Sequence, residues 1–229
     1  MRETRNRNQV LPTLTALLSL VWLASGCGGG GGSAQSTPTN PGPSYTDVVG
    51  EGWSAFHSGD YQGAITRFEQ AISMDSTQVE AFSGLGWSLS RLGELETADP
   101  VFARGSSKAG SAALRADLFA GWAFLTNARA DTSGTDLQSY LDSNSRAGQA
   151  LTLAPAWSFS HIAGLDDQDL HLLRAANDFL LGEFTQSLTE TRVLAPTFTA
   201  DVATPDGRAA LAAEIESLHS TRVGLGFGG

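Results

Sequence analysis

The chain has 229 residues, of which 41% are hydrophobic and 17% are charged, and its formal net charge at pH 7 is −10. This length can bury one medium-sized core or one short array of repeats. The acidity argues against binding to nucleic acid or to anionic lipid head groups, because both surfaces attract an excess of positive charge. The single cysteine, Cys27, excludes an intramolecular disulfide, so the fold depends on packing alone.

Residues 1–26 have the organisation of a secretory signal peptide. Three arginines and one glutamate lie within the first seven residues, and a mainly apolar run follows from Val10 to Leu23. This run is too short to be interpreted first as a membrane-spanning helix. Because the segment carries a net charge of +2, the remainder of the chain carries −12.

Cys27 directly follows that segment. The sequence Leu-Ala-Ser-Gly-Cys over residues 23–27 resembles the bacterial lipobox, in which cleavage occurs before a cysteine that carries lipid. The resemblance implies that Cys27 is lipidated, and acyl chains contribute about 0.8 kcal/mol of membrane affinity per buried methylene. Gly28 stands where an aspartate would favour inner-membrane retention, so we expect an outer-membrane anchor facing the periplasm. The alternatives are secretion with an incidental cysteine, an uncleaved anchor, or anchoring in the inner membrane.

Residues 27–44 are interpreted as a linker. Five consecutive glycines, Gly28 to Gly32, precede a stretch rich in serine, threonine and proline. Such a composition cannot bury a core, so the segment is expected to hold the following domain away from the membrane as a flexible tether.

Between residues 45 and 110 the sequence repeats with a spacing of 34 residues. Gly52-Trp53 recurs as Gly86-Trp87, and the apolar residues between them follow the i, i+3, i+4, i+7 pattern of amphipathic helices. A period of this length is typical of a helix–turn–helix repeat. The other matched pairs are Gly59 and Gly93, Ala64 and Ala98, Phe68 and Phe102, and Ala71 and Gly105.

Several residues predict where these helices begin. Ser44 and Asp47 have the spacing of a capping box, Thr77 and Glu80 have the same spacing, and Asp60 follows Gly59 as a cap for a second helix. Pro100 falls where the second helix of the second repeat should already be running, and an interior proline costs about 3 kcal/mol. That helix is therefore expected either to tolerate the proline or to begin late, with Asp99 as its cap.

The residue types at these positions resemble the tetratricopeptide repeat (TPR). In that family, small residues lie where two helices cross closely, and this sequence has small residues at each of those positions in both repeats. The resemblance implies an all-α solenoid that binds proteins or peptides, with no catalytic residue and no cofactor. The matching small residues are Gly52, Ala64, Ala71, Gly86, Ala98 and Gly105.

Residues 111–196 predict two divergent hairpins. In the first, a helix containing Leu118 to Leu125 precedes a long loop at 128–135 and a second helix from Leu137 to Leu153. An irregular connector follows, and the fourth hairpin has its turn at residues 181–184. Residues 197–229 predict a capping helix that starts at Thr204-Pro205, and a loose tail. The expected fold is thus three to four TPR-like hairpins plus a C-terminal capping helix.

Five apolar residues are candidates for a protein-binding groove: Trp53, Phe56, Trp87, Trp122 and Leu125. In the family that the chain resembles, the position of Trp53 and Trp87 faces the concave groove, and Trp122 takes it too if one residue is inserted between repeats. Exposed aromatic side chains in a groove are typical anchors for peptide partners. Alternatively, these rings are covered by the inserted loop or the last helix, or only pack between repeats.

No arrangement of reactive side chains predicts catalysis, and no metal site is expected. His161, Asp166, Asp167, Asp169 and His171 are close in sequence, but their spacing matches no known metal-binding loop, while His57 and His219 are expected to be isolated surface residues. The expected partner is a protein or peptide of unknown identity bearing positive charge, with the membrane contacted through the lipid on Cys27. The rival hypotheses are a periplasmic binder of small molecules or glycans and an accessory protein with weak hydrolase activity.

Overall fold

A computed structural model describes residues 42–133 and 136–222 of the chain. The expected signal peptide, Cys27 and residues 27–41 of the expected linker lie outside the described residues. None of the helices in the described ranges is long and apolar enough to cross a membrane. These helices are α1 (Tyr45–His57), α2 (Tyr61–Met74), α3 (Val79–Arg91), α4 (Leu95–Gly105), α5 (Ala112–Ser133), α6 (Leu137–Leu153), α7 (Asp167–Leu180), α8 (Phe184–Leu194) and α9 (Pro205–Thr221).

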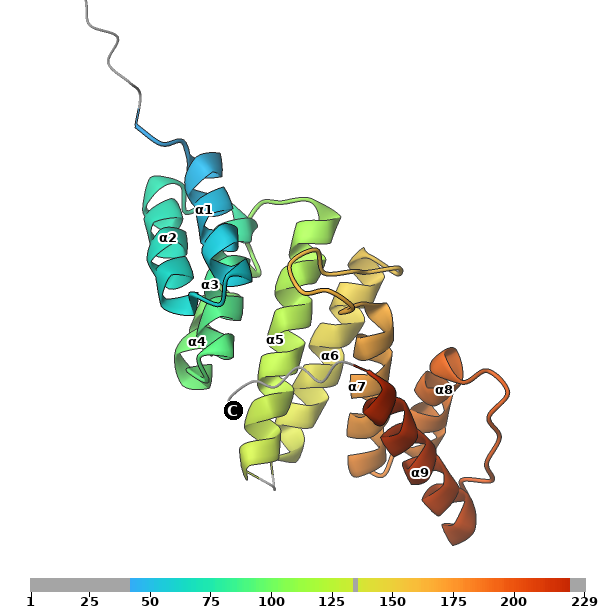
Figure 1. Ribbon diagram of the computed structural model, residues 1–229. Coiled ribbons are helices and arrows are strands. Elements are labelled where there is room, and N and C mark those ends of the chain that lie inside the picture. Colours follow the sequence, from blue (N-terminus) through green and yellow to red (C-terminus); the bar gives the residue numbers. More distant parts are fainter. Residues whose placement is uncertain (1–41, 134–135, 223–229) are drawn as a thin grey trace, which may run out of the picture. The chain divides into compact units, whose positions relative to one another are not determined.

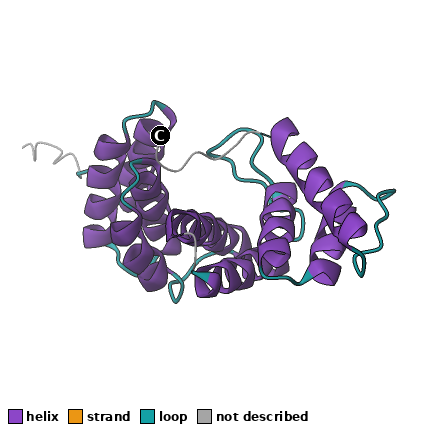
Figure 2. Ribbon diagram, turned by 90° about the horizontal axis from the view of Figure 1, so that it is seen from below, coloured by secondary structure: helices purple, strands orange, loops and turns teal. Residues whose placement is uncertain are grey.

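The helices form four hairpins, α1–α2, α3–α4, α5–α6 and α7–α8, and α9 packs on the last of them (Figure 1). Each hairpin also contacts the next one, so that α3 packs on α2, α5 on α3 and α4, and α7 on α6. Short turns join α1 to α2, α3 to α4 and α7 to α8 (Figure 2). The expected all-α architecture of stacked hairpins with a C-terminal capping helix is confirmed.

Local signals fix most helix ends as expected. The capping box at Ser44 and Asp47 starts α1, and the Asp60 carboxylate accepts a hydrogen bond from the Gly63 amide at the start of α2. Gly59 and Gly93 adopt the left-handed conformation, with φ of 80° and 78°, which a side chain would strain.

The capping box expected at Thr77 and Glu80 is wrong. Helix α3 begins at Val79, its N-cap residue is Gln78, and no side chain caps it. The backbone amide and hydroxyl of Thr77 instead donate to Oδ1 of Asp75, at 2.9 Å and 2.6 Å. The Asp75 carboxylate therefore orders the turn before α3 rather than the helix itself.

The repeated glycines lie where an aromatic ring of the paired helix approaches the backbone. A Cβ on Gly52 would come within 2.8 Å of the Phe68 ring, and one on Gly86 within 2.6 Å of the Phe102 ring. Both rings are fully buried. The 34-residue echo in the sequence therefore reflects one packing contact made twice, by α1 with α2 and by α3 with α4.

Two expectations about helix ends need correction. Helix α4 starts at Leu95 and contains Pro100, so it does not begin late at Asp99. Helix α5 continues to Ser133, so the long loop expected from residue 128 is also wrong. Ala130 is buried, and the Arg129 guanidinium pairs with Glu96 at 3.0 Å and Asp99 at 3.4 Å. These contacts with α4 hold the last turns of α5 despite a loop-like composition.

The segment between α6 and α7, residues 154–166 (the connector), belongs to the main core. Trp157, Phe159 and Leu165 are each at most 3% exposed and join one apolar cluster with residues of α1 to α7. A second, smaller cluster holds α9 through Leu211 and Ile215. Beyond that helix, Arg222 pairs with Asp166 and Asp169, which form the capping box that starts α7.

Candidate binding site

The connector lies against the first helix of each of the first three hairpins. Phe159 stacks on Trp87 of α3 with ring centroids 4.5 Å apart, and His161 stacks on Trp53 of α1 at 3.6 Å. The Trp157 indole N–H donates to Oδ1 of Asp117 on α5 over 2.7 Å. One segment of the chain, which folds back on itself through an antiparallel bridge between Ser158 and Asp166, therefore covers three helices through side chains at alternate positions.

Asp117 is the polar centre of this contact. Its backbone carbonyl accepts the indole N–H of Trp87 at 3.1 Å, while its carboxylate accepts that of Trp157. Burial raises the pKa of Asp117 to about 6, against the opposing effect of the Trp157 hydrogen bond and with a smaller contribution from Glu80. Both tryptophans can be buried because their only polar atom has a partner.

His161 forms the other end of the contact. Its Nδ1 lies 3.2 Å from Nε2 of His57, so the sequence-based expectation that His57 is isolated is wrong. Burial, together with a smaller effect of the neighbouring His57, lowers the pKa of His161 to about 4. The neutral imidazole can stack on Trp53 as an aromatic ring, whereas a protonated one would bury a charge.

Four of the five groove candidates are buried beneath the connector or within the stack. Trp53 is 6% exposed and Phe56 4%, while Trp87 and Leu125 are fully buried. His161 covers the ring of Trp53 and Phe159 covers that of Trp87, so in this structure these two rings are covered, as in the alternative to an open groove. That these residues bind a partner stays a prediction.

Trp122, the fifth candidate, is partly exposed and lines a cavity of about 460 Å³ between α5, α6 and the end of α4. Its indole N–H donates to Oδ1 of Asp99 at 2.7 Å. The guanidinium carbon of Arg146 lies 3.9 Å from the centre of its ring. Trp122 thus contributes a ring to a surface cavity, in an environment different from that of Trp53 and Trp87.

Two arginines line this cavity, which we call the Trp122 cavity. Arg146 donates to the Thr126 hydroxyl and lies 3.9 Å from the Asp142 carboxylate, and burial lowers its pKa. The Nε atom of Arg115 is buried, and no acceptor within the described residues contacts it. Both guanidinium groups therefore lie in one cavity, where Asp99 and Asp142 only partly offset the burial of Arg146 and no carboxylate pairs with Arg115 within the described residues.

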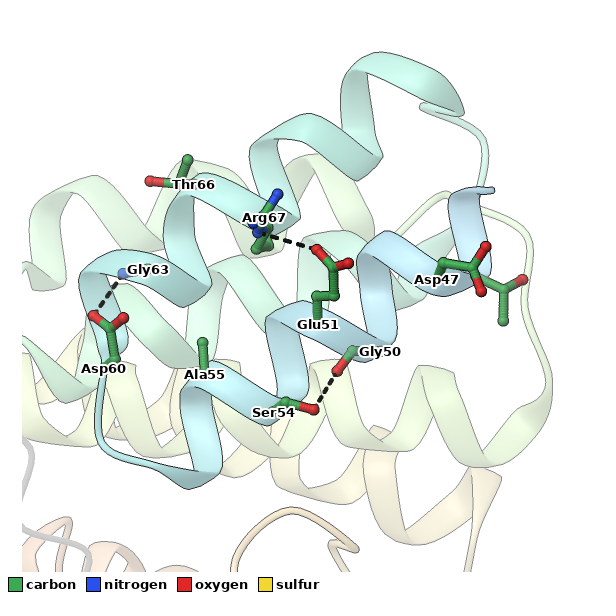
Figure 3. A pocket seen from close by; sticks show the side chains of 10 residues that line it. Asp47, Gly50, Glu51, Ser54, Ala55, Asp60, Gly63, Thr66 and Arg67 are labelled. Carbon is green, nitrogen blue, oxygen red and sulfur yellow. Dashed lines mark hydrogen bonds and ion pairs between the residues drawn. The ribbon is translucent and has the colours of Figure 1, made fainter. Parts of the chain in front are cut away.

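A larger hollow, of about 970 Å³, lies between α1 and α2 (Figure 3). Its lining is mostly small and polar, and the Glu51–Arg67 ion pair, 3.2 Å long, joins the two helices across it (Figure 3). Asp60 is already engaged in capping α2. The charged groups that could recognise a ligand here have protein partners, so this surface is the weaker candidate.

The histidines and aspartates considered for a metal site do not come together. Asp166 and Asp169 contact Arg222, and His171 contacts Glu190 at 2.6 Å, whereas His161 lies on Trp53. Within the residues that the structure describes, no group of three or more histidine, cysteine, aspartate or glutamate residues could hold a metal ion.

The sequence did not predict the residues that define the surface beneath the connector or the Trp122 cavity. Trp157 and Phe159 alternate with serines in a segment interpreted only as a connector, and large aromatic residues in a loop are a signal that the loop is buried. Asp117, Arg115 and Arg146 lie on helical faces that nothing in the local pattern distinguishes from solvated ones. Their roles depend on helices that are distant in sequence.

The fold resembles known TPR structures, whereas sequence comparison finds no relative. No family model matches the chain, and no curated protein is significantly similar in sequence. A tetratricopeptide repeat protein from Parabacteroides merdae superimposes with a TM-score of 0.51 and 14% identity, over 77% of this chain. The match spans 62% of that protein's length. A thermophilic TPR protein of Thermus thermophilus matches 76% of this chain and 83% of its own, with a TM-score of 0.44 and 20% identity.

The class of protein follows from these observations. The described part of the chain is a TPR-like helical repeat protein, built from four hairpins and a capping helix.

Proposed function

We propose that this chain is a protein-interaction scaffold that a lipid on Cys27 tethers to the bacterial envelope, facing the periplasm, where it serves an assembly or secretion complex. In solenoids built from helical hairpins, the stacked helices create an extended surface that can bind a partner. Support for the tether comes only from the lipobox-like sequence at residues 23–27 and the glycine-rich segment after it.

The observation that carries the binding proposal is the connector itself. A segment with aromatic side chains at alternate positions lies across α1, α3 and α5, held by two stacked rings, the Trp157–Asp117 hydrogen bond and the contact between His161 and His57. An extended segment of a partner that carries aromatic residues at alternate positions could make the same contacts after replacing the connector. Release of the connector exposes apolar surface, and binding of the partner segment buries it again. The exchange therefore does not cost the full free energy of burying the connector.

Crosslinked pull-down from the native envelope tests this function. The wild-type chain is compared with Phe159→Ala, which weakens the connector, and with Trp87→Ala, which removes the ring that the connector covers. We expect Phe159→Ala to recover more of the same proteins and Trp87→Ala to recover less. Identical recovery by all three chains would contradict a binding role for this surface.

The tether is tested separately by Cys27→Ser. We expect this variant to leave the membrane fraction, because serine has no sulfur to which the lipid can be attached. If the variant remains in the membrane fraction, lipidation is not the anchor, and the binding proposal is unaffected.

A further inference from the structure

The Trp122 cavity combines features that rarely occur together on this acidic chain. It has two guanidinium groups, a partly exposed indole ring and the buried ring of Phe119, and its volume is about 460 Å³. We propose that it is a binding site for a carboxylate attached to an apolar body. The site is separate from the surface beneath the connector, so it goes beyond the function proposed above.

Arg115 provides the first reason. Its Nε is buried with no acceptor among the described residues, and no ion pair of its guanidinium occurs in that part of the chain. A buried donor without an acceptor destabilises the fold, more so when it is charged. A ligand that supplies an acceptor oxygen removes this penalty once the Arg115 side chain turns its Nε, which is shielded from solvent in the free chain, towards the cavity.

Arg146 provides the second reason. The Trp122 ring lies 3.9 Å beneath its guanidinium carbon, and the pairing with Thr126 restricts it further, so the planar group is held in place before any ligand arrives. A preorganised guanidinium loses less conformational entropy when it binds a carboxylate in a bidentate manner. Its nearest carboxylate, Asp142, is 3.9 Å away, which leaves room for a closer acceptor.

The charge in the cavity selects among anions. Two arginines and one aspartate line it, and the nearby Asp99 and Arg129 act on Arg146 in opposite directions, so the lining leaves a net charge of +1. A single carboxylate balances that charge, whereas a doubly charged phosphate would exceed it and be repelled by Asp142. The rings of Trp122 and Phe119 favour an organic body beside the charged group over a bare inorganic ion.

The ligand could be an acidic side chain of a partner protein or a free organic acid, because both present the same chemistry. Isothermal titration calorimetry on the full-length chain in non-ionic detergent distinguishes them. The probes are 3-phenylpropionate, its neutral isostere 3-phenylpropionamide, inorganic phosphate, and a blocked dipeptide of phenylalanine and glutamate with no free terminus.

We expect saturable binding of 3-phenylpropionate, of the dipeptide, or of both, with the tighter of the two identifying the source. The amide and phosphate should bind at least about tenfold more weakly, as expected for loss of one charge-assisted hydrogen bond. Comparable binding of the amide, or tighter binding of phosphate, would overturn the carboxylate assignment. Absence of saturable heat with both carboxylates would overturn the site.

Substitutions of arginines test whether the carboxylate binds in the Trp122 cavity. Arg115→Gln should weaken the favoured carboxylate about tenfold or more, and Arg115→Lys should weaken it less, since it keeps the charge without the planar fork. Arg104→Gln is the matched control: Arg104 also lies near an aromatic ring, Phe82 at 5.2 Å, but does not line the cavity. Because Arg115 makes no ion pair in the described structure, its substitution should preserve the fold, which circular dichroism checks. Equal affinity of the Arg115→Gln and Arg104→Gln chains would contradict the proposal.

Discussion

The indole N–H of Trp157 donates to Oδ1 of Asp117 over 2.7 Å, and this bond joins the connector to α5. Together with the contact between His161 and His57, it gives direction to an interface that is otherwise made of stacked rings. Because the acceptor is a buried carboxylate, the bond also connects the packing of the connector to pH.

Asp117→Asn tests that connection. Burial raises the pKa of Asp117 from 3.8 to about 6, so its contribution to stability is fully present below pH 3.8 and is lost as the pH rises through about 6. Asparagine keeps an acceptor for Trp157 and does not ionise. We expect the variant to be more stable than the wild type at pH 8, by at most about 3 kcal/mol, and to lose this advantage by pH 4.

Urea unfolding of both chains at pH 8, 6 and 4 measures this difference. Burial also raises the pKa of Asp178 to about 6, so only the difference between wild type and Asp117→Asn reports on Asp117. A stability difference that is the same at all three pH values would contradict the assignment.

His161 has the opposite dependence. Burial and His57 lower its pKa from 6.5 to about 4, so its contribution is present above pH 6.5 and is lost as the pH falls towards 4. His161→Phe keeps a ring against Trp53 without titrating. We expect the urea midpoint of the wild type to fall relative to that of this variant as the pH is lowered from 6.5 to 4. His219→Phe, an exposed position on α9, is the control and should show no such trend.

The stacked hairpins could be predicted because their signals are local. The capping box at Ser44 and Asp47 and the glycine turns at Gly59 and Gly93 each depend on a few neighbouring residues, and each occurs in the structure as expected. The extension of α5 could not be predicted in this way. Its last turns are stabilised by Arg129 contacting Glu96 and Asp99 on another helix, which outweighs a loop-like composition.

The candidate site was predictable only in part. Placement of Trp53 and Trp87 on first helices follows from the repeat pattern, but their exposure depends on Phe159 and His161, which come from a connector far along the chain. Repeat spacing carries no information about such a segment. Trp122 differs because no connector residue stacks on it, so it alone among the three repeated tryptophans is partly exposed while the connector is in place.

The repeated glycines give a test of the packing. Gly86→Ala would place a Cβ within 2.6 Å of the Phe102 ring, so we expect a loss of about 1–3 kcal/mol in the free energy of unfolding. Gly50→Ala on α1 is the matched control, since its Cβ would meet nothing within 4 Å and alanine favours helix by up to about 1 kcal/mol. Denaturant unfolding compares them. Equal destabilisation by both would contradict close packing at Gly86.

Arg222 gives a test of how α9 is held. It contacts both aspartates of the capping box at the start of α7, and the side chain of Asp169 is only 10% exposed. We expect Arg222→Gln to lower the protection of α9 amides from hydrogen exchange by about 1–3 kcal/mol, because it leaves a nearly buried carboxylate without its cation. Arg67→Gln, in an ion pair about half exposed on both sides, should change protection by less than about 1 kcal/mol. Unchanged exchange in α9 would argue against the Arg222 contact.

We propose that the first helices of the hairpins bind an aromatic segment of a partner in exchange for the connector. The most direct measurement is fluorescence anisotropy of a labelled synthetic peptide, residues 155–165, titrated with the full-length chain in detergent. We predict saturable binding to the Phe159→Ala chain, much weaker binding to the wild type, whose own connector competes, and none for a peptide lacking both Trp157 and Phe159. Absence of binding to a Phe159→Ala chain that keeps its helical circular dichroism would show that the connector is a fixed part of the core and would contradict the claim.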